Sequence, residues 1–231
     1  MTVDANSVGK IPFAEARKIV FYLDGLQYSF AMADIAAKRL TKTLDSIVLR
    51  QKTLQEDCKE EVASALLDAW SLVDMCHRIR ELIHGMPGLS AKKQPEVRIF
   101  LQSTGQVETL RNYVQHFRNG IPKSPTPSSP LWGTLSWSPT DDPMACYTIF
   151  TGNIIPGVTA PTLAFDTHKS KFSSRIILFA GDSAIDLDLI AEQMSKMKTW
   201  TVKWLEQKKN VKLVKGKTLI WSFRMLPTGK E

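Results

Sequence analysis

The residues of this sequence whose types and spacing could do chemistry are Arg111, Asn112 and His116. A histidine near neutral pH can take a proton from a ribose 2′-hydroxyl or give one to a leaving 5′-oxygen. An arginine can hold the scissile phosphate and stabilise the charge that develops on it in the transition state. With Asn112 orienting either group, these residue types suit acid–base chemistry at a phosphate ester.

The spacing of Arg111 and His116 restricts how the two side chains can act together. Successive residues of an ideal helix turn by about 100°, so residues five positions apart diverge by about 140°. Convergence on one phosphate therefore requires a frayed helix end, a long arginine reaching across, or a second chain that supplies the other half. Gly120 and Pro122 place His116 near the predicted end of its helix, which is compatible with fraying.

Residues 110–119 resemble the signature of the HEPN superfamily, in which an arginine is followed by a polar residue and then a histidine on a late helix of a helical bundle. Active members of that family are metal-independent endoribonucleases, many of them toxins or defence proteins, and pairs of chains bring two motifs together. The resemblance implies catalytic roles for Arg111, Asn112 and His116, a homodimer that acts on RNA, and no cofactor or metal. The alternative is a non-catalytic HEPN-like module that binds nucleic acid or a protein partner.

Basic residues gather near the end of the sequence. The formal net charge is +7, and from Met194 onward there are ten Lys or Arg and two Glu, a local charge of +8. Such asymmetry is typical of proteins with an acidic partner, so we expect Arg118, Lys196 and Lys203 to contact nucleic acid. A solvated, lysine-rich helix face is the alternative, and the scarcity of arginine favours it over bidentate phosphate recognition.

Other residues with chemical potential have simpler interpretations. Trp132 and Trp137 could stack on bases, although anchors of a core or interface are the more common role of tryptophan. Arg78 and His84, with His77 and Arg80 beside them, form a cluster that we interpret as a polar helix end, where Arg and His favour the terminal carbonyls. His168 is predicted at a hairpin tip. The three cysteines form no CxxC pair, so neither a disulfide framework nor a zinc site is indicated.

Apolar periodicity defines the elements that must position these residues. Helices are predicted over residues 13–51, 54–83 and 95–118, with Gly105 as a candidate interruption of the third. Four short segments rich in β-branched and aromatic residues predict a small antiparallel sheet, at 131–137, 145–150, 162–166 and 175–179. A long helix over 185–208, capped by residues 182–184, and a strand over 219–225 complete an α+β fold.

The proline-rich residues 121–130 predict an extended connector between a helical bundle (1–120) and a β meander with the basic helix and terminal strand (131–231). Alternatively, the last helix joins the first three in one four-helix domain, and the sheet is an insertion. No run of about 18 apolar residues is present, and residues 1–10 lack the layout of a secretory signal. We therefore expect a cytoplasmic protein without a membrane partner.

Overall fold

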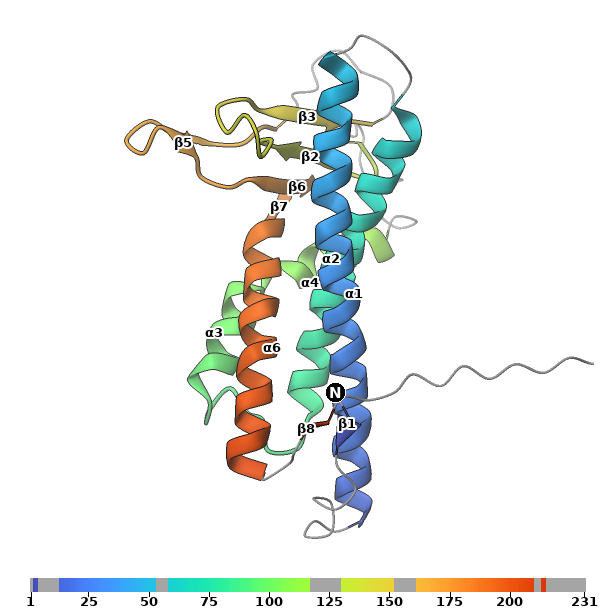
Figure 1. Cartoon of the computed structure of the whole chain (residues 1–231), viewed down its shortest axis with the longest axis vertical. Coiled ribbons are helices and arrows are strands. Elements are labelled where there is room, and N and C mark those ends of the chain that lie inside the picture. The colour runs from blue at the N-terminus through green and yellow to red at the C-terminus, as the bar shows by residue number, and fades with distance from the viewer. Residues whose placement is uncertain are drawn as a thin grey trace, which may run out of the picture.

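The computed structural model describes residues 2–3, 13–52, 58–116, 130–151, 161–209 and 213–214. The fold is α+β: one long helix runs the length of the molecule, further helices flank it, and a small sheet lies at one of its ends (Figure 1). The helices are α1 (Phe13–Lys52), α2 (Lys59–Gly85), α3 (Pro95–Ser103), α4 (Gln106–Gln115) and α6 (Leu187–Lys209). Within the described ranges, no helix combines the length and apolar character needed to cross a bilayer.

Helices α1 and α2 form an antiparallel pair, as contacts at both of its ends show. Arg50 near the end of α1 pairs with Glu61 near the start of α2 at 3.0 Å, while Gly85 at the end of α2 lies against the Tyr22 ring. The predicted apolar stripes are buried between the helices and their neighbours, including Leu40 and Leu44, Ile47 and Val48 of α1 and Ala69, Val73, Cys76 and Ile79 of α2. Ile35 fits the same apolar period of α1 and is nevertheless 55% exposed.

The third predicted helix is divided at Thr104 and Gly105 into α3 and α4. Pro95 occupies the first turn of α3 and Glu96 follows it, because proline lacks the amide hydrogen that a first turn leaves unpaired and acid suits the positive helix end. The Thr104 hydroxyl donates to the Phe100 carbonyl at 2.6 Å and helps to close the end of α3. The chain therefore changes direction before the segment that carries Arg111.

The main sheet is antiparallel with the strand order β3-β2-β6-β7, and β2 (Thr134–Trp137) is buried along its whole length. Its partners are β3 (Tyr147–Phe150) and β6 (Ile176–Ala180). The edge strand β7 (Ser183–Asp186) pairs with the other side of β6. A separate hairpin joins β4 (Phe165–Asp166) to β5 (Lys171–Phe172), with His168 in its turn as predicted. Two short strands, β1 (Thr2–Val3) and β8 (Leu213–Val214), pair with each other.

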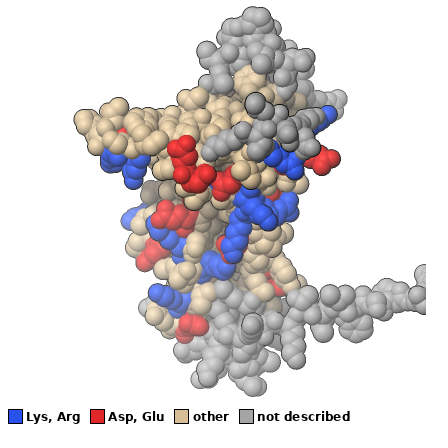
Figure 2. Space-filling view, turned by 45° about the horizontal axis from the view of Figure 1, so that its top comes forward, with Lys and Arg blue, Asp and Glu red and all other residues tan. Residues whose placement is uncertain are grey.

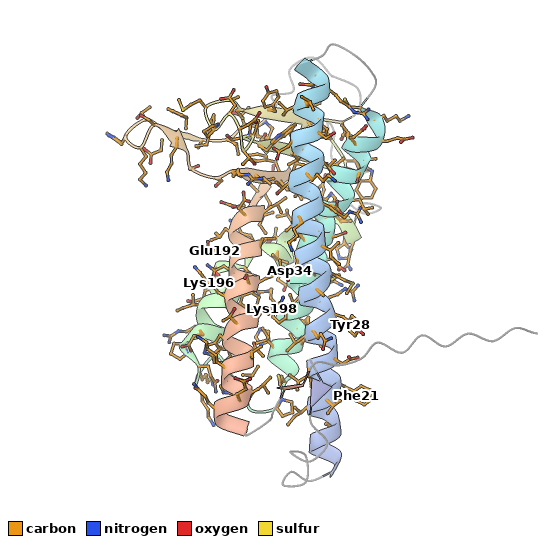
Figure 3. The ribbon with its side chains drawn as sticks, in the orientation of Figure 1. Phe21, Tyr28, Asp34, Glu192, Lys196 and Lys198 are labelled. Atoms are coloured by element: carbon orange, nitrogen blue, oxygen red, sulfur yellow. The ribbon has the colours of Figure 1, made fainter. Side chains whose placement is uncertain are left out.

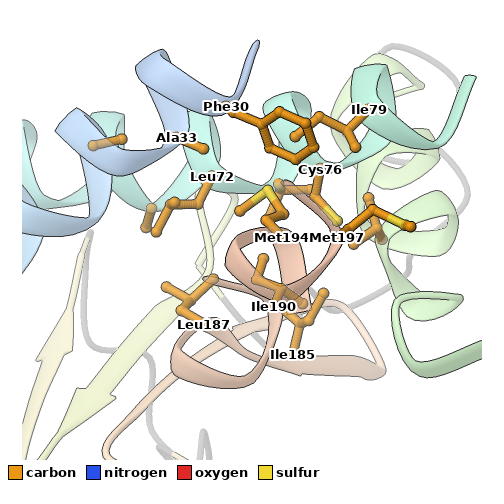
Figure 4. Close-up of a cluster of buried hydrophobic side chains, with 14 of the residues drawn as sticks. Phe30, Ala33, Leu72, Cys76, Ile79, Ile185, Leu187, Ile190, Met194 and Met197 are labelled. Atoms are coloured by element: carbon orange, nitrogen blue, oxygen red, sulfur yellow. The ribbon is translucent and has the colours of Figure 1, made fainter. Parts of the chain in front are cut away.

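Helix α6 closes the helical layer. It packs against α1, α2 and α3, and its buried residues meet Phe30 of α1 and Cys76 of α2 in one apolar cluster (Figure 4). The predicted cap at residues 182–184 is wrong, since Ser183–Asp186 is a strand. The strand ends at Asp186, directly before the first residue of α6. The Asp186 carboxylate accepts the Leu189 amide hydrogen at 2.8 Å and so caps the helix in place of residues 182–184.

The apolar core continues from the helices into the sheet, and the same cluster includes Leu135, Trp137 and Leu178. Residues 121–129 of the predicted connector and the predicted strand over 219–225 lie outside the described residues.

Candidate functional site at the end of α4

Arg111 precedes the last turn of α4, Asn112 begins that turn, and His116 is the cap residue. The Asn112 carbonyl accepts the His116 amide hydrogen at 3.1 Å, so the helical bonding extends to the cap. His116 itself leaves the helical conformation, with φ −110° and ψ 20°. Asn112 and His116 are exposed, whereas the Arg111 side chain is 30% exposed. The helix is therefore ordered through Gln115, and Arg111 and His116 leave it in different directions.

Arg111 faces a carboxylate of the neighbouring helix. Its Nε lies 4.0 Å from Asp74 Oδ1 in α2, within ion-pair range but too far for a hydrogen bond. The other Asp74 oxygen accepts a hydrogen bond from Arg78 Nε at 2.7 Å. Arg111 Nε is buried and has no hydrogen-bond partner among the described residues. Two guanidinium groups thus share one carboxylate, which leaves a net positive charge beside Asn112.

One helical turn away, a more buried polar network joins α2 to α4. Arg80 donates to Glu108 Oε1 at 3.0 Å through Nε, and to the Leu101 carbonyl and the Thr104 hydroxyl at 2.6 and 2.7 Å through Nη1. His77 Nδ1 lies 3.0 Å from Glu108 Oε2. The interpretation of this cluster as a polar helix end is confirmed for His84, which lies in the last turn of α2. It is wrong for His77 and Arg80, which lie inside α2: His77 contacts α4, and Arg80 contacts α3, α4 and their junction.

The network sets the ionisation of its acid and of the adjacent thiol. Burial raises the pKa of Glu108, but the hydrogen bonds and charges of Arg80 and His77 outweigh it, so the pKa lies below its usual 4.5. Burial raises the pKa of the Cys76 thiol to about 12. Cys76 is therefore protonated at neutral pH and is no candidate nucleophile.

Three groups of this network have the donor types of a metal site. A ring nitrogen of His77 and carboxylate oxygens of Glu81 and Glu108 all lie within 4.8 Å of one another. Imidazole and carboxylate suit Zn²⁺ or Mn²⁺. The Arg80 guanidinium, 3.0 Å from the same Glu108 carboxylate, opposes a cation there, because it already neutralises the acid. Within this cluster, Glu108 already contacts both Arg80 and His77.

The predicted nucleic-acid contacts on α6 are not brought to the end of α4. Lys196 pairs with Glu192 at 2.6 Å, and the neighbouring Lys198 pairs with Asp34 of α1 at 2.7 Å (Figure 3). Lys203 is exposed and, with Lys196, lines a shallow pocket of about 350 Å³ that also includes Trp200. On the face shown in Figure 2, basic and acidic side chains alternate instead of forming one basic surface. Arg118 lies outside the described residues.

The two tryptophans of the 132–137 segment have different environments. Trp137 is 2% exposed and stacks on Tyr147 with ring centroids 5.6 Å apart, as expected of a core anchor. Trp132 is 50% exposed, and its carbonyl accepts a hydrogen bond from Trp70 Nε1 at 3.1 Å. A mostly apolar pocket of about 560 Å³ lies between the end of α1, the start of α2 and strands β2 and β3. No residue of α4 lines this pocket, and Trp132 is hydrogen-bonded to Trp70 of α2.

Sequence reasoning missed Asp74 and Glu108, the two carboxylates that face the basic residues of this site. Asp74 lies 37 positions before Arg111, and an isolated acid on a helix gives no signal of a partner at that distance. The repeated arginines of α2 were the only indication that acids must lie opposite them. No protein-family model matches the sequence, and no curated protein or solved structure matches the chain.

Proposed function

We propose that the chain is a metal-independent endoribonuclease of HEPN type that acts as a dimer, with its site at the end of α4. The observation that supports this most is the placement of Arg111 beside Asp74 and Arg78, with Asn112 and His116 exposed at the same helix end. The surplus positive charge of the two arginines suits a phosphate. An accessible imidazole nearby suits proton transfer at neutral pH.

Each residue has a distinct role in this proposal. Arg111, oriented by Asp74, binds the scissile phosphate and stabilises its developing charge. His116 takes the proton of the 2′-hydroxyl or protonates the leaving 5′-oxygen, and Asn112 orients the phosphate or the imidazole. Since α4 is helical through Gln115, Arg111 and His116 of one copy diverge, and a second copy supplies the complementary group.

The test is cleavage of RNA in the presence of EDTA by the parent protein and by His116→Ala. We expect the parent to release fragments with 2′,3′-cyclic phosphate ends, and the variant to lose about 100-fold or more of the rate. His168→Ala is the matched control, because His168 is also exposed and lies in the β4–β5 turn. Circular dichroism of each variant checks that the fold is kept. Equal cleavage by the parent and His116→Ala would remove the proposal.

Non-catalytic binding of nucleic acid is the second candidate. It is favoured by the pocket on α6, where Trp200 lies between the exposed Lys196 and Lys203. Stacking on tryptophan and contact with lysines are typical of single-strand binding. In this case RNA binding persists in His116→Ala, weakens with salt, and is reduced by a Lys196→Gln and Lys203→Gln double variant.

A further inference from the structure

Helix α1 carries a stripe of large apolar side chains that face away from the core. Phe21, Tyr28, Met32 and Ile35 are 68%, 48%, 46% and 55% exposed. Figure 3 shows Phe21 and Tyr28 projecting from the side of α1 opposite α6, while Asp34 reaches toward Lys198 of α6. Isolated exposed apolar residues are ordinary, whereas these four lie in a row along one face of a single helix.

The spacing of these four residues aligns them along the helix. They recur at intervals of seven, four and three, which is the spacing of a coiled-coil seam. At about 100° per residue they fall within an arc of about 60°, centred well away from the buried face. Arg39, which continues the seam, pairs with the buried Asp68 at 3.2 Å and ends the apolar surface. We call Phe21, Tyr28, Met32 and Ile35 the α1 stripe.

The size of the α1 stripe falls in the range of the largest apolar patch on a typical monomer, about 300–600 Å². It extends over about 21 Å of helix, from Phe21 to Ile35. At their exposed fractions, four side chains of these sizes present on the order of 400–500 Å² of surface. Apolar patches of this extent are often functional, and a stable dimer buries about 800 Å² per partner. The α1 stripe with its polar rim would supply most of such an interface.

We propose that the α1 stripe is the contact between two copies of this chain, with the two α1 helices antiparallel and the two-fold axis near Tyr28. The spacing is self-complementary in this arrangement. Phe21 and Ile35 lie seven positions on either side of Tyr28, so Phe21 of each copy meets Ile35 of the other. A two-fold interface requires this kind of self-match.

Gly25 lies beside the α1 stripe, where α2 packs closely against α1. A Cβ added to Gly25 would lie 3.1 Å from a Leu82 methyl group of α2. The glycine thus lets Leu82 approach the backbone of α1 and fill the space beside it. The α1 stripe then presents its large side chains outward, above a surface already packed by α2, and a second helix can lie along it.

The interface does not depend on the ribonuclease assignment, although that assignment also needs two copies. The test is the oligomeric state of the full chain, measured by light scattering and analytical ultracentrifugation from low to high micromolar concentration. We expect a dimer for the parent protein. Ile35→Glu should weaken it by about 100-fold or more, because each dimer loses two buried apolar contacts and gains two charges.

Ile99→Glu is the matched control, since Ile99 in α3 has the same residue type and the same 55% exposure as Ile35. It should leave the dimer unchanged. Tyr28→Cys in a Cys146→Ser background should be joined across two copies by a short bis-maleimide, and Ile99→Cys in that background should not. A parent that stays monomeric, or equal loss of dimer in Ile35→Glu and Ile99→Glu, overturns the proposal.

Three further outcomes separate the interface from the ribonuclease assignment or assign the α1 stripe to another segment. If the parent is monomeric and deletion of residues 215–231 creates a dimer, that segment covers the α1 stripe and the proposal is wrong. A dimer that Ile35→Glu dissociates but that cleaves no RNA supports the interface and rejects only the ribonuclease assignment. Cleavage by a parent that is monomeric throughout rejects both the interface and the two-copy site, and leaves only an acid–base role of His116 within one chain.

Discussion

Arg80 in α2 donates to Glu108 in α4 at 3.0 Å, across the helix interface that also holds Arg111. The same guanidinium donates to the Leu101 carbonyl and the Thr104 hydroxyl, so one side chain binds the end of α3 and the first turn of α4. Glu108 and Arg111 lie one turn apart on α4. The Arg80 network therefore fixes the helix from which the proposed phosphate-binding residue projects.

Replacing Arg80 should be far more costly than replacing Arg78. Arg80→Met keeps the apolar stem but leaves the Leu101 carbonyl and the Thr104 hydroxyl oxygen without this donor and Glu108 with His77 alone, and we expect a loss of about 3 kcal/mol in the free energy of unfolding. Arg78→Met removes an exposed ion pair with Asp74 and should cost at most about 1 kcal/mol. Urea denaturation measures both values. Similar small losses would show that the Arg80 network contributes little.

The stability contributed by Glu108 should depend on pH. Its pKa is lowered in the folded state, so the contribution is present at neutral pH and is lost as pH falls below 4.5 through the folded pKa. Glu108→Gln should therefore unfold at lower urea than the parent at pH 7, and the difference should shrink toward pH 3. Urea midpoints at several pH values check this. A difference that stays constant with pH would contradict the role of the charge.

Cys76 and Cys146 should differ sharply in reactivity. Cys76 is fully buried, and burial raises the pKa of its thiol to about 12, whereas Cys146 is exposed. Iodoacetamide at pH 8 should label Cys146 in the folded protein, and should label Cys76 only after denaturation. Peptide mass spectrometry gives the extent at each site. Rapid labelling of native Cys76 would mean that the interface between α2 and α6 opens readily.

Gly133 should tolerate no side chain. Its φ of 84° lies in the left-handed region, and a Cβ there would overlap the Phe179 carbonyl oxygen of the neighbouring strand. Gly133→Ala should cost about 2 kcal/mol or more. Gly25→Ala is the control, because Gly25 is helical and the neighbouring Leu82 methyls can move. Its effect should stay within about 1 kcal/mol. Thermal unfolding of both variants tests the difference.

Local sequence signals predicted the parts of the fold that depend on local chemistry. The helices α1 and α2 follow apolar periodicity, and α3 begins at Pro95. The break between α3 and α4 falls at Thr104 and Gly105, two neighbouring residues of low helix propensity. His168 lies in a turn because polar residues surround it. Each of these features is decided by residues within a few positions.

Features that depend on distant residues were missed. Ser183 reads as a helix cap, yet it belongs to β7 because pairing with Ala180 of β6 outweighs the local preference. Ile35 fits the apolar period of α1 and still lies outside the core, since periodicity cannot tell which of two apolar faces is covered. Asp74 opposes Arg111 only because α2 and α4 lie side by side. In the candidate site, the basic residues were predicted from the sequence, whereas their acidic partners were not.

The position of α6 in the chain also affects how the protein is made. Phe30, Leu72 and Cys76 are covered by a helix that begins only at Leu187, about a hundred residues after α2 ends. At the usual rate of translation, roughly 5–20 residues per second, the α1–α2 pair waits at least several seconds on the ribosome with an uncovered apolar face. We therefore expect chaperones to bind the exposed apolar face of the emerging chain, and fragments that end before Leu187 to aggregate.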